Sequence, residues 1–192
     1  AGVDKPLDYL VPPELAARLA AEATSAVRLE ADVPTEAGAR LVERFAGDPS
    51  RRLELLAVTG TNGKTTTSWL ARQLLAPGRP GQGPVPVGLI GTVSVHDGRA
   101  MHDARLTTPD PFELSPLLAR MVDHGCPFAV MEASSHGLDQ GRLAGVRLMT
   151  AIFTNLSGDH LDYHGTMDAY AAAKRRLFEL LDPAGTAIVN VD

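Results

Sequence analysis

Residues 58–67 read Val-Thr-Gly-Thr-Asn-Gly-Lys-Thr-Thr-Thr, a glycine-containing loop followed by a lysine and three threonines. The mostly apolar residues 53–58 before it predict a buried strand, and residues 64–75 predict a helix. Glycines free the backbone of such a loop, so consecutive N–H groups can turn toward an anion. The positive end of the helix would face the same anion. The stretch therefore predicts a binding loop for a nucleoside triphosphate with magnesium.

The residue types in the loop suit different parts of a metal-bound triphosphate. Lys64 supplies a charge for the β- and γ-phosphates, and Thr65 offers an oxygen to the metal. Only two residues separate Gly60 from Gly63, a shorter spacer than in the common phosphate loop. A chance Asn-Gly turn is the alternative, which the lysine and threonines between strand and helix disfavour. The predicted nucleotide-binding residues are Gly60, Thr61, Asn62, Gly63, Lys64, Thr65 and Thr66.

Composition excludes several classes of protein. With 192 residues, 44% of them hydrophobic and 21% charged, the chain has the composition of a globular protein with one good core. Its net charge of −5 and the lack of a dense basic run give no reason to expect nucleic acid as a partner. No run approaches the ~20 apolar residues that cross a bilayer, and no secretory signal is recognisable. We therefore expect a cytoplasmic protein without a membrane partner.

Cys126 is the only cysteine, which excludes an internal disulfide and a cysteine-based zinc cluster. A reactive thiol is one interpretation of this residue. Its apolar setting before Pro127-Phe128-Ala129-Val130 favours a packing role instead.

From residue 53 onward, predicted strands alternate with predicted helices. Strands are expected at 53–58, 85–90, 127–132, 148–154 and 186–191, and helices at 64–75, 111–124 and 167–181. Residues 92–106 predict a hairpin with Asp97-Gly98 at its turn. The alternation predicts an α/β fold with a mostly parallel sheet wrapped by helices. Ligands then bind at the carboxyl ends of the strands.

Residues 1–50 differ from the rest and predict a short helical and extended segment, including helices at 14–26 and 35–45. We expect a truncated or atypical N-terminal segment over 1–50 and an ATP-binding domain over 51–192.

Polar residues follow the predicted strands. Glu132 leaves an apolar strand, where a carboxylate could reach a magnesium ion on a triphosphate. A solvated charge is the alternative, which the apolar strand before it disfavours. For His136 we expect local capping or packing. Thr108 and Asp110 precede a predicted helix, and taken alone both are typical of helix caps.

Two further segments carry candidate residues. Gln140 and Arg142 are two apart, and arginine suits bidentate capture of carboxylate or phosphate, although either alone reads as a solvated side chain. Residues 155–165 contain two aspartates and two histidines, but no His-Glu-x-x-His or cysteine supports a zinc site. No Gly-x-Ser-x-Gly supports a serine triad. Lys174, on its own, predicts a solvated helix face.

Taken in order, these motifs resemble those of the Mur ligases of peptidoglycan synthesis. More narrowly, they resemble the members that add the third amino acid to UDP-N-acetylmuramoyl-L-alanyl-D-glutamate. The resemblance runs from about residue 27 to 192. The phosphate loop is shared with folylpolyglutamate synthases, whereas Thr107-Thr108-Pro109 and residues 132–142 and 159–165 are more selective.

The resemblance implies an enzyme that uses ATP and Mg²⁺ to form an acyl phosphate, which the amine of an amino acid attacks. It assigns catalytic roles to Lys64, Glu132, His160 and Lys174. It gives Thr65 and Glu132 to a first magnesium, His160 to a second, and matches Lys174 to a lysine often carbamylated in the family, which could then ligate metal. It implies substrate-binding roles for Thr107, Thr108, Ser134, Gln140 and Arg142.

Family members have three domains, and this chain resembles the central one alone. We therefore expect a fragment that binds nucleotide with little ligase turnover, lacking the C-terminal domain that selects the amino acid. The alternatives are a nucleotide-binding pseudo-ligase or interaction module, and a folylpolyglutamate or cyanophycin synthase. The loop spacing disfavours a P-loop kinase or GTPase.

Overall fold

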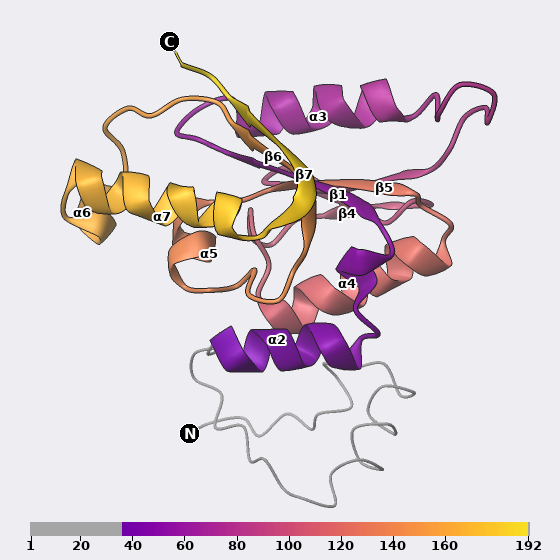
Figure 1. Cartoon of the computed structure of the whole chain (residues 1–192), viewed down its shortest axis with the longest axis horizontal. Helices are drawn as coiled ribbons and strands as arrows, with labels where there is room; N and C mark the ends of the chain where they lie inside the picture. The colour runs from indigo at the N-terminus through magenta and orange to yellow at the C-terminus, as the bar shows by residue number, and fades with distance from the viewer. Residues whose placement is uncertain (1–35, 192) are drawn as a thin grey trace, which may run out of the picture.

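The computed structural model of the protein describes residues 36–191 and is built around one seven-stranded sheet (Figure 1). The strands are β1 (Glu54–Thr59), β2 (Val87–Ile90), β3 (Ser94–His96), β4 (Met101–Asp103), β5 (Phe128–Glu132), β6 (Leu148–Phe153) and β7 (Leu181–Val189). The helices are α2 (Glu36–Phe45), the 3₁₀ turn η2 (Pro49–Arg51), α3 (Lys64–Leu75), α4 (Pro111–Asp123), α5 (Ser135–Asp139), α6 (Leu161–His164) and α7 (Met167–Glu179). The predicted α/β class is confirmed.

The sheet is mostly parallel, with the order β4-β3-β2-β5-β1-β6-β7. Strands β2, β5, β1, β6 and β7 pair in parallel, while β3 pairs antiparallel with β2 and β4. Strands β3 and β4 form the hairpin predicted for residues 92–106. Because β2, β5, β1 and β6 run the same way, the segments that follow them meet at one edge of the sheet.

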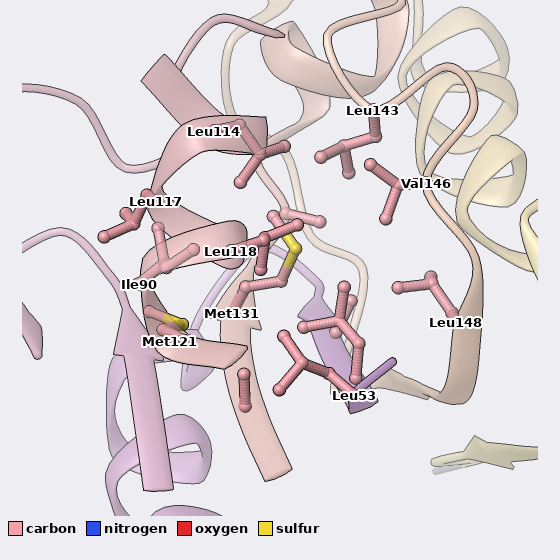
Figure 2. Packing of buried hydrophobic residues seen from close by; sticks show 14 of the residues in the cluster. Leu53, Ile90, Leu114, Leu117, Leu118, Met121, Met131, Leu143, Val146 and Leu148 are labelled. Atoms are coloured by element: carbon pink, nitrogen blue, oxygen red, sulfur yellow. The ribbon is translucent and has the colours of Figure 1, made fainter. Parts of the chain in front are cut away.

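Helices cover both faces of the sheet, with α3 on one and α4, α5 and α7 on the other (Figure 1). The strands alternate accordingly: in β5, Ala129 and Met131 face the α4 side, and Phe128 and Val130 face α3. In Figure 2, leucines and Met121 of α4 gather around Met131. The buried Cys126 belongs to this larger cluster, which confirms the packing role predicted for it.

Helix α2 confirms the helix predicted at 35–45 and is tied to the domain by a buried carboxylate. Glu43 is 2% exposed and accepts hydrogen bonds from the Ser50 N–H and the Ser115 hydroxyl of α4. Two bonds to one buried anion compensate for its lost hydration. The helix predicted at 14–26, and the rest of the segment before residue 36, lie outside the described residues.

The last strand is longer than predicted. The expected strand 186–191 is instead β7, which begins at Leu181, directly after α7 ends at Glu179 rather than at 181. Leu181 pairs with Leu148 and Thr186 with Thr150, so residues 182–185 form an irregular bulge within the strand. Its Asp-Pro-Ala-Gly sequence is typical of a turn, which concealed the start of the strand. None of the helices among residues 36–191 is long and apolar enough to cross a membrane.

Candidate functional site

The predicted site residues gather where β1, β2, β5 and β6 end. The loop after β1 lies between the continuations of its two neighbours, since Ala133 N donates to Val58 O and Thr154 N to Thr59 O. The strand order, with β1 between β5 and β6, therefore brings residues almost a hundred positions apart into contact.

The loop has the backbone that the glycines predicted. Gly60 and Gly63 have φ values of 145° and 83°, which residues with a side chain rarely adopt. A Cβ at Gly60 would lie 1.9 Å from Thr154 Oγ1. Helix α3 follows with Gly63 as its N-cap, no side-chain capping bond and no acidic residue in its first turn. Its first N–H groups and its dipole are therefore suited to an anion.

A part of the site that the sequence analysis missed supports this loop from β6. Asn155 Oδ1 accepts from Asn62 N at 3.0 Å, and Asn155 Nδ2 donates to Asn62 O at 3.1 Å. Thr61 N donates to Asn155 O at 2.9 Å, and Thr154 Oγ1 donates to Asn62 O at 2.6 Å. Thr154 is the last residue of the strand predicted at 148–154 and Asn155 follows it directly, and this position was the signal that could have found them.

The Thr61 side chain makes hydrogen bonds within the protein. Its hydroxyl donates to Ser157 O at 3.1 Å and accepts from Ser157 N at 3.0 Å, and the Tyr170 hydroxyl lies 3.2 Å from it. Because the N–H groups of Thr61 and Asn62 also bond Asn155, the groups left to face an anion are those of Gly63 and the first turn of α3. Thr61 therefore shapes the loop in this structure, and the nucleotide-binding role expected for it stays a prediction.

Two lysines converge on the loop. Lys64 Nζ donates to Gly60 O and Thr61 O, and Lys174 Nζ donates to Gly60 O. Burial lowers the pKa of Lys64, against the attraction of Glu132 and Asp159. Burial, and then the charge of Lys64, lower the pKa of Lys174 to about 7.

The prediction of a solvated helix face for Lys174 is wrong, because the residue is only 2% exposed. Helix α7 buries Tyr170, Ala173, Lys174 and Leu177, which follow helical spacing. Lys174 Nζ also lies 4.2 Å from the centroid of the Tyr170 ring. The charged neighbours Arg175 and Arg176 concealed that spacing in the sequence.

Glu132 provides a buried carboxylate beside α3. It is 1% exposed, so the solvated alternative is wrong. Its Oε2 accepts from Thr65 Oγ1 at 3.0 Å and from Thr92 Oγ1 at 2.9 Å, and its Oε1 accepts from Thr92 N at 3.1 Å. In the sequence, Thr92 was predicted only as part of the hairpin at residues 92–106.

These oxygens fit a magnesium ion. Carboxylate and hydroxyl oxygens are hard ligands, and Mg²⁺ usually takes one or two carboxylates together with substrate phosphates. Among residues 36–191, no group of three or more His, Cys, Asp or Glu side chains could hold a metal ion. This gives no support to zinc, and a magnesium ion here would depend on phosphate oxygens.

The predicted substrate-binding residues are linked on the far side of Glu132. Thr108 Oγ1 donates to Glu132 O at 3.0 Å and accepts from Ser134 N at 2.9 Å. Arg142 donates to Gln140 Oε1 and, through Nη1, to Thr108 O at 2.8 Å. The prediction that Gln140 and Arg142 are merely solvated is therefore wrong, and these four residues form one network.

Of the two residues expected to cap a helix, one does so. Asp110 caps α4 by accepting from Phe112 N and Glu113 N, as predicted. The capping interpretation of Thr108 is wrong, because its buried hydroxyl instead bonds Glu132 O at the end of β5 and Ser134 N just after it.

Histidine rings form a separate cluster near Tyr170. The His136 ring lies 4.9 Å from that of His160 and 4.2 Å from that of Tyr163, which confirms the packing role expected for His136. His160 has φ 53° and precedes α6, and its ring lies 6.2 Å from that of Tyr170. His160, which was predicted to hold a second magnesium ion, therefore lies on the same side of the loop as Lys174, because both are near the Tyr170 ring.

Comparison with known proteins gives a family match. The model of the Mur ligase middle domain matches residues 58–192. The chain is 44% identical over 184 residues to the UDP-N-acetylmuramoyl-L-alanyl-D-glutamate–2,6-diaminopimelate ligase of Synechococcus elongatus, covering 95% of this chain and 36% of that protein. It is 50% identical over 135 residues to the ligase of the same name from Pseudomonas aeruginosa, covering 70% of this chain and 27% of that protein.

Solved structures of Mur ligases also align with this chain. A diaminopimelate ligase structure of the same name aligns with a TM-score of 0.63 at 37% identity, over 80% of this chain and 31% of that one. The MurF ligase of Thermotoga maritima in complex with ADP aligns with a TM-score of 0.57 over 82% of this chain and 33% of that one, and at 18% identity it shares the fold alone. The chain thus spans about a third of the length of the relatives it matches.

Proposed function

Because the chain belongs to the Mur ligase family, in which it matches the middle domain, we propose that it forms the nucleotide site of an ATP-dependent ligase. The ligase adds the third amino acid to UDP-N-acetylmuramoyl-L-alanyl-D-glutamate in peptidoglycan synthesis. The observation that carries the proposal is the position of Lys64 and the Thr65–Glu132 pair at the uncapped start of α3. The relatives named for that ligation support the choice of substrate.

The proposed reaction has two steps. A carboxylate oxygen of the muramoyl dipeptide attacks the γ-phosphorus of ATP, and ADP leaves with the bridging electrons. The amine of the incoming amino acid then attacks the acyl phosphate carbon, loses a proton, and expels inorganic phosphate. The residues of this chain act mainly by positioning these groups and by balancing phosphate charge.

In this proposal the N–H groups of Gly63 and of the first turn of α3, together with Lys64, hold the phosphates. Thr65 and Glu132 would hold a magnesium ion, which supplies positive charge to the phosphate oxygens. Lys64 is tethered to Gly60 O and Thr61 O, so its ammonium is already held beside the loop before a phosphate arrives. The network of Thr108, Ser134, Gln140 and Arg142 would hold the muramoyl dipeptide, with Thr107 beside it.

On the other side of the loop, we propose that Lys174 is carbamylated. A carbamate offers two anionic oxygens where an ammonium offers none. His160 would hold a second magnesium ion near it. The burial of Lys174 and its lowered pKa support this role, because only the neutral amine reacts with carbon dioxide.

A second candidate is a nucleotide-binding module without ligase turnover. It uses the same phosphate loop but makes no use of the network around Arg142. The two candidates differ in whether the muramoyl dipeptide changes the affinity for nucleotide.

Calorimetric titration with a non-hydrolysable ATP analogue and Mg²⁺ tests the proposal. We expect binding that Lys64→Met abolishes and that Arg175→Met, a change at an exposed cation of α7, leaves intact. Saturating UDP-N-acetylmuramoyl-L-alanyl-D-glutamate should change the dissociation constant of the analogue by about threefold or more. An unchanged constant favours the module without turnover, and no binding at all contradicts both candidates.

A further inference from the structure

Thr92 lies where the two halves of the site meet. It follows β2, and the proposed function leaves it without a role. Its backbone N–H donates to Glu132 Oε1 at 3.1 Å, and its hydroxyl donates to Glu132 Oε2 at 2.9 Å. The same hydroxyl lies 3.0 Å from Thr107 Oγ1. Thr92 therefore touches a predicted metal residue and a predicted substrate residue at once.

The sheet fixes this position. β2 and β5 run in parallel with Ile90 beside Met131, so the next residues along both strands are neighbours. A Cβ at Gly91 would lie 2.4 Å from Glu132 Oε1, so with any other residue at this position the carboxylate would have to shift. Gly91 N also donates to Ser94 O, at the start of β3. Thr92 is thus held by strand register and a tight turn, although it is exposed to solvent.

The direction of the hydrogen bonds follows from counting protons. Ionised Glu132 can only accept, so the single hydroxyl proton of Thr92 is directed to it. The oxygen of Thr92 must then accept from Thr107, whose hydroxyl is the only remaining donor of that pair. The chain of bonds therefore runs from Thr107 through Thr92 to the carboxylate of Glu132. A ligand that reorients the Thr107 hydroxyl, or a metal ion that binds Glu132, therefore alters the same series of hydrogen bonds.

We propose that Thr92 is a positioning residue that couples the magnesium side of the site, at Glu132, to the muramoyl-peptide side, at Thr107. The inference rests on the proposed function. It means that the two ligands influence each other's affinity through Thr92, and by linkage the effect is equal in both directions. Loss of one hydrogen bond to a charged group corresponds to a change of roughly tenfold in such coupling.

The first test measures how much Mg²⁺ strengthens the binding of the ATP analogue. The ratio of dissociation constants with EDTA and with Mg²⁺ is determined for the parent chain, Thr92→Val and Thr92→Ser. Valine keeps the shape and the backbone N–H but removes the hydroxyl, whereas serine retains it. We expect Thr92→Val to reduce the ratio about tenfold, with Mg²⁺-free affinity unchanged, and Thr92→Ser to retain it. Thr186→Val, at an exposed threonine of β7, is the matched control.

The second test measures coupling to the other half. The change in analogue affinity on adding UDP-N-acetylmuramoyl-L-alanyl-D-glutamate is determined for Thr92→Val, Thr107→Val and the double variant. We expect each single change to remove the coupling and the double change to remove no more, because both break one chain of bonds. A merely structural role would lower the melting temperature and leave both ratios unaltered. If Thr92→Val does not fold, Thr107→Val breaks the same chain from its other end.

The outcomes separate the two proposals. Unchanged ratios in Thr92→Val and Thr107→Val, with normal binding by the parent, overturn the role of Thr92 and leave the proposed function standing. A parent chain that binds no nucleotide with Mg²⁺ overturns the proposed function, and this inference with it.

Discussion

Lys64 and Lys174 both donate a hydrogen bond to the carbonyl oxygen of Gly60, over 2.9 and 2.8 Å. They reach it from different helices, α3 and α7, so the tertiary fold creates the pair. Two cations at one carbonyl repel each other, and both are withdrawn from water. Burial and the charge of Lys64 accordingly bring the pKa of Lys174 to about 7.

Lys174 is therefore expected to form a carbamate with dissolved carbon dioxide. Its neutral amine attacks the carbon and releases a proton, and the neutral fraction rises as pH passes upward through about 7. Carbon-13 NMR of the chain in ¹³C-bicarbonate should show a carbamate signal that grows from about pH 6 to about pH 8.5. Lys174→Met should remove the signal and Lys64→Met should not. Persistence of the signal in Lys174→Met would assign it elsewhere.

Replacing Gly60 should damage the phosphate loop. Gly60→Ala combines a φ of 145° with a Cβ 1.9 Å from Thr154 Oγ1, so the loop must shift. We expect the free energy of unfolding to fall by about 2–4 kcal/mol and nucleotide affinity to fall at least tenfold. Denaturant unfolding and calorimetry measure the two effects. Gly158→Ala is the matched control, because a Cβ there meets nothing within 4 Å. Equal effects of Gly60→Ala and Gly158→Ala would contradict the prediction.

Asn155 should hold the loop in its binding geometry. Asn155→Ala removes both side-chain bonds to Asn62 and leaves Thr61 N bonded to the backbone oxygen of residue 155. We expect a loss of about 1–3 kcal/mol in unfolding free energy and weaker nucleotide binding. Asn155→Asp keeps the acceptor for Asn62 N, so its unfolding free energy and nucleotide affinity should lie between those of the parent and Asn155→Ala. Full affinity in Asn155→Ala would show that the loop keeps its shape without this support.

Asp97 should make stability depend on pH. Burial alone would raise the pKa of this carboxyl, but bonds from Ala100 N and Arg99 N, with His102 and His124 nearby, hold it well below its usual 3.8. A carboxyl with a lowered folded-state pKa stabilises the fold above its unfolded pKa, and this stability is lost as pH falls below about 3.8.

Asp97→Asn should therefore be less stable than the parent near neutral pH, by about 2 kcal/mol. The difference should shrink on acidification, because the unfolded parent takes up a proton at Asp97 that the folded parent does not. Urea unfolding at about pH 7 and about pH 3 measures it. A difference that stays constant or grows on acidification would contradict this account of the hairpin turn.

Sequence patterns predicted the site's location because it depends on local features. A strand followed by glycines and Lys64 defines the loop, and Glu132 at the end of an apolar run marks the neighbouring strand. Parallel pairing then requires both to lie at one edge of the sheet. The same reasoning pointed to residues 155–165, which follow the strand on the other side.

What the sequence could not supply is the direction of individual hydroxyls and cations. Thr61 turns into the fold, whereas Thr92 turns toward Glu132, and nothing in the threonine pattern distinguishes them. The burial of Lys174 depends on where α7 packs against the loop, and the early start of β7 depends on a bulge. These features are properties of tertiary packing and pairing.

A crystal structure of the chain with a non-hydrolysable ATP analogue and Mg²⁺ tests the central claim most directly. The account predicts phosphate density against Gly63 and the first turn of α3, with Lys64 turned to it and a metal ion between Thr65 and Glu132. Triphosphate bound away from the 60–65 loop, or a metal ion that contacts neither Thr65 nor Glu132, would contradict it.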